Sequence, residues 1–171
     1  MAKAPTLRNL SSMVPTPEHL DQIAKEIETA SDRHFAILAA TDTENLLQEA
    51  ILLSLPQQDK ETTERLTGDR GSVNSFSQKI DLGFALALYD KATQSDLHRI
   101  RAIRNAFAHT FMPIDFDTPQ VASKAMVLTS GQFDNPPNTT NRDRFRYAYR
   151  FITNALLRFM IERQKATPSA S

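Results

Sequence analysis

The chain has 171 residues, which is enough for one domain with a substantial core. Its 20 lysine and arginine residues balance 20 aspartate and glutamate residues, and this neutrality argues against a strong non-specific hold on DNA. The absence of cysteine excludes disulfides, thiolate zinc sites and a cysteine nucleophile. Only four glycines are present and no Gly-x-Gly-x-x-Gly or Walker-type loop, which argues against a phosphate-cradling protein. No secretory segment or long apolar run stands out, so we expect a cytoplasmic protein without membrane contact.

The two ends of the chain differ from the segment between them. Residues 1–15 are polar and contain proline, which predicts a flexible N-terminus. Residues 166–171 predict a disordered tail, because they are mostly small and polar and include proline. Residues 16–165 are expected to form a single helical-bundle domain. Its first helix begins at Thr16 and continues to about residue 30, since apolar residues recur there at helical spacing.

A second helix is predicted from His34 to Leu55 by the same spacing, and Pro56 ends it. Ser31-Asp32 comes just before this helix and is a candidate to cap or kink it. Residues 56–74 are polar, and a loop of this length in a compact domain is often functional.

The second half of the chain predicts more helices and a turn-rich loop at residues 134–138. These helices cover residues 75–88 with a cap at Asn74 or Ser75, about residues 95–110 with a cap at Ser95-Asp96, residues 118–128 from Thr118-Pro119, and the C-terminal helix capped by Asn141. No period-two run of strand residues stands out. The predicted fold is therefore all-α, a bundle of five or six helices.

The most informative stretch of the sequence is Ile100–His109, in which Arg104 and Asn105 are followed by His109. On a helical wheel Arg104 falls within an apolar stripe, whereas Asn105 and His109 share a neighbouring polar stripe. The apolar stripe comprises Leu97, Ile100, Ile103, Phe107 and Phe111, and the polar stripe comprises His98, Arg101, Asn105 and His109. The position of Arg104 in the apolar stripe requires an explanation, because the wheel directs its charged side chain toward the core.

A core-facing arginine stays charged and requires a carboxylate or several carbonyl groups. The candidate carboxylates are Asp42, Glu44, Glu49 and Asp81. One interpretation of Arg104 is a structural ion pair that fixes how two helices meet. The other is a rim or dimer groove in which its guanidinium faces a phosphate, because the planar fork matches phosphate oxygens.

The other two residues of the motif also allow two interpretations each. His109 either acts as a general acid or base or interacts with the negative end of its helix. Asn105 either orients His109 or binds a nucleotide edge, or it forms an interhelical hydrogen bond.

The Arg-Asn-x-x-x-His pattern late in a helix of an all-α bundle resembles the HEPN superfamily. Many HEPN proteins are metal-independent ribonucleases in which two such motifs meet across a dimer. The resemblance would make Arg104 and His109 the residues that act on the scissile phosphate and the ribose 2′-hydroxyl, beside Asn105. No metal or cofactor would take part.

A longer part of the chain, from about Asp32 to Leu128, resembles the mannitol operon repressor family. The matching pieces are Asp32–Leu38, Glu44–Leu47, Ser75–Leu86, Ile100–His109 and Phe116-Asp117. This resemblance implies an all-α protein of the kind named for repression of a sugar-alcohol operon. No helix-turn-helix is evident, so regulation is expected through protein partners and not through direct reading of DNA.

Three functions are therefore open. The first is a non-catalytic regulator or interaction module, which we favour and expect to be a homodimer paired near the motif. The second is a HEPN-type ribonuclease with a toxin-like or defence role, using Arg104, Asn105 and His109. The third is nucleic-acid binding by residues 142–150, where four arginines alternate with aromatic residues. The aromatic residues of that segment are more simply read as core. The four histidines lack ligand spacing, so no metal site is expected.

Overall fold

The computed structural model describes residues 18, 22, 25, 26, 29–56, 59–68, 71–131, 136 and 138–166. Within these residues the chain is all-helical without a strand, which confirms the predicted all-α bundle. The helices are α3 (Asp32–Ser54), α4 (Lys60–Thr67), α5 (Phe76–Ala85), α6 (Lys91–His109), α7 (Pro119–Ala125) and α8 (Asn141–Ala166). The helix predicted over residues 16–30 and the turn at 134–138 lie mainly outside the described residues, as do both chain ends.

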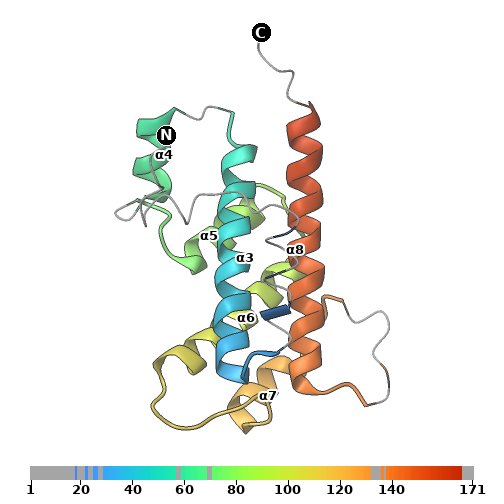
Figure 1. Cartoon of the computed structure of the whole chain (residues 1–171). Helices are drawn as coiled ribbons and strands as arrows, with labels where there is room; N and C mark the ends of the chain where they lie inside the picture. The colour runs from blue at the N-terminus through green and yellow to red at the C-terminus, as the bar shows by residue number, and fades with distance from the viewer. Residues whose placement is uncertain are drawn as a thin grey trace.

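The long helices α3, α6 and α8 form the frame of the bundle (Figure 1). α3 and α8 lie side by side and run in the same direction, since Asp32 pairs with Arg142 at their starts and Asp42 with Tyr149 further along. α6 packs against α3 and runs the opposite way (Figure 1). α5 packs on both α3 and α6, and the short α7 lies at the end of the bundle where α3 and α8 begin (Figure 1).

Four phenylalanine rings pack together at this end of the core. Phe35, Phe107, Phe116 and Phe145 are each at most 2% exposed. Neighbouring ring centroids are 5.1 to 5.9 Å apart in tilted and edge-on arrangements, which stabilise beyond the area that they bury. The cluster ties α3, α6 and α8 to the connection between α6 and α7, and so fixes the path of the chain where it leaves α6.

Side-chain caps define where α3 and α5 begin. Ser31, a candidate cap or kink in the sequence, caps α3, which begins two residues before the predicted start at His34, and Ser75 is the cap of the two candidates for α5. The Ser31 hydroxyl accepts a hydrogen bond from a backbone N–H one turn into α3. Ser75 starts α5 with a capping box, in which the Gln78 side-chain oxygen accepts from the Ser75 backbone N–H at 3.1 Å. α5 ends before the predicted residue 88, because Ala87 adopts the left-handed conformation (φ 56°) that commonly terminates helices.

The predicted start of α6 at Ser95-Asp96 is wrong. The helix begins at Lys91, and its cap is Asp90, whose carboxylate accepts from the Thr93 backbone N–H at 2.8 Å. α8 also begins one residue earlier than predicted, because its cap is Thr140, whose hydroxyl accepts from the backbone N–H of Asp143. The predicted cap of α8, Asn141, instead donates from its side chain to a carboxylate outside the helix.

Residues 56–74 contain a helix, α4, where the sequence predicted a loop. Asp59 caps it by accepting from the Thr62 backbone N–H at 2.9 Å, and Glu61 and Arg65 form an ion pair along its exposed face. No residue of α4 is buried. A helix without a buried stripe gives no hydrophobic periodicity, which is why the pattern did not reveal it.

Candidate functional site

Arg104 forms an ion pair with Glu44 of α3. Its Nη2 lies 3.2 Å from Glu44 Oε2, while the Nζ of Lys79 from α5 lies 2.9 Å from Oε1 of the same carboxylate. The side chains of Arg104, Glu44 and Lys79 are 27%, 17% and 8% exposed. One carboxylate therefore joins three helices and is shared by two cations, which leaves a positive charge on the group. Lys79 was missed by sequence analysis, because nothing local indicates that α5 would place it beside Glu44.

Two of the other carboxylates named as candidate partners of Arg104, Asp42 and Asp81, are directed elsewhere. Asp42 accepts the Tyr149 hydroxyl hydrogen at 2.7 Å, and burial raises the pKa of this carboxyl while the hydrogen bond opposes the shift. Asp81 pairs with His98 at 3.2 Å and accepts from the Gln94 amide. Burial also raises the pKa of Glu49. Glu44 is thus the carboxylate that fixes the position of Arg104.

The three residues of the motif are not brought together by a direct interaction. Asn105 is half-buried and His109 is exposed in the last turn of α6. Within the described part of the chain, neither side chain forms a hydrogen bond or an ion pair, either with Arg104 or with another residue. Arg104 therefore belongs to the contact between helices, and His109 faces solvent at the helix end.

The polar stripe of α6 is divided into two parts. His98, in its first half, faces Asp81 of α5. Arg101 is half-buried, and its Nε is buried without a hydrogen-bond partner among the described residues, as is the Nε of Arg104 one turn later. In the described residues Arg101 has no carboxylate partner. Within the described residues the guanidinium charge of Arg101 is therefore not compensated by a carboxylate, and Arg104 follows it one turn later.

The chain just after α6 displays two apolar side chains to solvent. Phe111, predicted to continue the apolar stripe, is 104% exposed, and Met112 is 68% exposed. The stripe ends because α6 ends at His109 and the chain turns away. Arg33 of α3 holds this turn: its guanidinium donates to the carbonyl oxygens of Phe107, Thr110 and Met112 at 2.8 to 3.1 Å.

Asp96 is a buried structural residue that sequence analysis assigned to a cap. Its side chain is fully buried and accepts from Arg99 at 2.6 Å, from the Thr129 backbone and hydroxyl, and from the Ser130 backbone. The carboxylate therefore anchors the chain that follows α7 to α6. A helical wheel gives the missed signal, because Asp96 falls beside the apolar residues of its helix.

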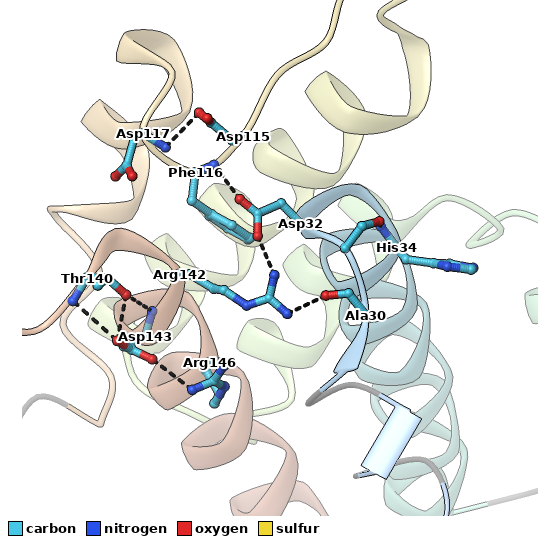
Figure 2. Close-up of polar contacts among 11 residues, drawn as sticks. Ala30, Asp32, His34, Asp115, Phe116, Asp117, Thr140, Arg142, Asp143 and Arg146 are labelled. Atoms are coloured by element: carbon cyan, nitrogen blue, oxygen red, sulfur yellow. Dashed lines mark hydrogen bonds and ion pairs between the residues drawn. The ribbon is translucent and has the colours of Figure 1, made fainter.

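The basic segment at residues 142–150 is largely used inside the fold. Figure 2 shows the Arg142 guanidinium between the Asp32 carboxylate and the Ala30 carbonyl oxygen, with both of which it forms hydrogen bonds. Arg146 pairs with Asp143 in the same view. The aromatic residues of this segment that face α3, Phe145 and Tyr149, are buried, in accord with the reading of them as core. Two of its four arginines are thus bound to carboxylates of the chain.

The described residues offer neither a metal-binding cluster nor a membrane-spanning helix. No group of three or more histidine, aspartate or glutamate side chains there could hold a metal ion. None of the described helices is long and apolar enough to cross a membrane. Comparisons of the chain with protein-family models, with curated proteins and with solved structures found no match.

Proposed function

We propose that this protein is a non-catalytic regulator that acts through protein partners, as its resemblance to the mannitol operon repressor family implies. The observation that carries the proposal is the ion pair between Arg104 and Glu44 of the same chain. An arginine that holds a reacting phosphate needs its guanidinium directed at the substrate, close to the acid or base that completes the chemistry. Arg104 is instead tied to α3, and no interaction joins it to His109.

The neutral charge of the chain supports a protein partner in preference to direct binding of DNA. Twenty cationic side chains are balanced by twenty anionic ones, and two arginines of the basic segment pair with carboxylates of the fold. A DNA-reading surface needs an excess of lysine and arginine on one face, because phosphate contacts provide much of the affinity. The homodimer and the cytoplasmic location stay predictions from the sequence.

A metal-independent ribonuclease of HEPN type is the second candidate. It is favoured by His109, which is exposed and has no partner among the described residues. Under this alternative Arg104 would have to leave Glu44 and turn toward the substrate, with Lys79 holding the carboxylate in its place.

The experiment that separates the two candidates measures cleavage of labelled, mixed-sequence RNA in the presence of a metal chelator. The wild-type protein is compared with His109→Ala, whose substitution is at an exposed position and leaves the core intact. Intact RNA with both proteins supports the regulator. Cleavage by the wild type that His109→Ala abolishes would establish the ribonuclease instead.

A further inference from the structure

The second half of α6 and the turn after it form an exposed surface that combines positive charge with apolar side chains. We call it the α6 surface; it consists of Arg101, Asn105, Ala108, His109, Phe111 and Met112. The first four are spaced four, three and one residues apart along α6, and the last two follow within three residues of the helix end. All are half-buried or exposed.

In the part of the chain that the structure describes, no carboxylate balances the charge on this surface. Arg101 has no acidic partner in the described residues, and the nearby Glu44 is already shared by Arg104 and Lys79. The next acids along the chain are turned toward α7 and α8. Asp115 accepts from the backbone N–H of Thr118, which caps α7, and Asp117 accepts from the side-chain amide of Asn141, the first residue of α8. In a chain whose total charge is zero, this local excess indicates a complementary, acidic ligand.

The apolar part of the surface is held rigidly in place. Phe111 and Met112 are among the most exposed large apolar side chains of the described residues. Arg33 fixes their backbone, because its guanidinium binds the carbonyl oxygens of Thr110 and Met112 in this turn and that of Phe107 at the end of α6. Burying an exposed aromatic side chain on a preorganised backbone gives binding energy with little loss of conformational freedom. The turn therefore has the properties of an anchor for a partner.

We propose that the α6 surface docks an acidic peptide segment of a partner protein. A carboxylate of the segment pairs with Arg101, and an apolar side chain of the segment packs on Phe111 and Met112. The proposal rests on the proposed function, because it specifies which chemistry the protein partner presents.

Two other occupants of the α6 surface complement it less well. RNA would find few cationic side chains on this surface, and Phe111 and Met112 cannot bind phosphate groups. A second copy placed on the same surface by two-fold symmetry would oppose Arg101 to an equally cationic face. Peptide docking on this surface replaces the homodimer contact that the sequence predicts near the motif, so a homodimer would have to form through another face.

The test is a selection of random linear peptides displayed on phage against the full-length chain. Binding of synthetic copies of the enriched peptides is then measured by fluorescence anisotropy. We expect enriched sequences that combine several acidic residues with one large apolar residue. Arg101→Glu and Phe111→Ser should each weaken their binding by about 30-fold or more, the effect of losing a central contact. Added salt should weaken the binding of the wild type.

Matched control variants lie on α8, at the opposite end of the bundle from the α6 surface (Figure 1). Arg158→Glu repeats the charge reversal and Ile161→Ser repeats the loss of an exposed apolar group, and both should leave peptide binding unchanged. Circular dichroism and thermal melts of all four variants verify that each is folded.

Several outcomes would overturn this proposal. They are failure to enrich peptides, enriched peptides without an acidic bias, and peptides that bind Arg101→Glu and Phe111→Ser as tightly as the wild type. Tighter binding of a single-stranded, mixed-sequence RNA that Arg101→Glu abolishes would assign the surface to nucleic acid. A wild-type dimer that Phe111→Ser converts to a monomer would assign it to self-association. RNA cleavage lost in His109→Ala would instead refute the proposed function, so the two failures are distinguishable.

Discussion

The substitution Asp96→Asn is expected to destabilise the protein strongly although it changes only one atom of the side chain. Asp96 is fully buried, and each of its two oxygens is used. One accepts from Arg99 at 2.6 Å, and the other accepts from Thr129 and from the Ser130 backbone at 2.6 Å. An asparagine has one acceptor oxygen, so its amide group must face either Arg99 or the donors of the 129–130 segment.

The magnitude follows from the bonds that are lost. The favourable orientation of the asparagine keeps its oxygen toward Thr129 and Ser130 and loses the charge-assisted bond to Arg99. Hydrogen bonds to charged groups contribute about 1.5–3 kcal/mol, and those that remain become weaker without the charge. We expect a loss of about 3 kcal/mol in the free energy of unfolding. This corresponds to a decrease of roughly 6–12 °C in the melting temperature for a chain of this size.

Urea denaturation followed by far-UV circular dichroism measures this effect. The matched control is Asp115→Asn, since Asp115 accepts from similar donors, including the Thr118 backbone and hydroxyl, but is exposed to solvent. Its loss of stability should be much smaller, because water replaces the missing interactions. Equal effects of the two substitutions would refute the reasoning that burial makes Asp96 a structural anchor.

Two further predictions concern other polar contacts of the fold. Burial raises the pKa of Asp42 above its ordinary value of 3.8, so the folded protein favours the protonated carboxyl. The resulting stabilisation is fully present below pH 3.8 and is lost as the pH rises through the raised pKa. Asp42→Asn, which can still accept from Tyr149, should therefore gain stability relative to the wild type as pH rises, as denaturation at several pH values would measure; a pH-independent difference would contradict this. Arg33→Ala should cost about 1–3 kcal/mol and speed chymotrypsin cleavage after Phe111, because the carbonyl oxygens of this turn lose their donor; unchanged cleavage would show that Arg33 does not hold the turn.

The sequence predicted those helices of the described chain that bury an apolar stripe. α3 and the core face of α8 follow directly from 3.6-residue periodicity, and a serine marks the start of α3 and of α5. α4 was missed because its stability does not depend on a buried face. The start of α6 was misplaced because an aspartate can have either of two roles in a helix. It is a common helix cap, and it can also be buried inside the helix when both of its oxygens accept hydrogen bonds. Asp90 and Asp96 therefore could not be distinguished without knowing what packs on α6.

The candidate site could be predicted only in part. The helical wheel placed Arg104 toward the core and gave Glu44 as one of four possible partners, and the structure contains that pair. It could not reveal Lys79 or Arg33, because their contacts depend on how separate helices approach each other. Phe111 was assigned to the core because the wheel continues a helix that in fact ends two residues earlier.

The central claim is that Arg104 belongs to the fold through Glu44, and a double-mutant cycle of Arg104→Ala and Glu44→Ala tests it most directly. Exposed ion pairs contribute about 0.2–1 kcal/mol, whereas breaking a buried pair costs about 3–5 kcal/mol. This pair is partly buried, and Lys79 still neutralises Glu44 when Arg104 is removed. We therefore predict a coupling free energy of about 1–2 kcal/mol between the two residues in urea denaturation. A coupling of zero, with Arg104→Ala as stable as the wild type, would contradict the claim and favour the ribonuclease.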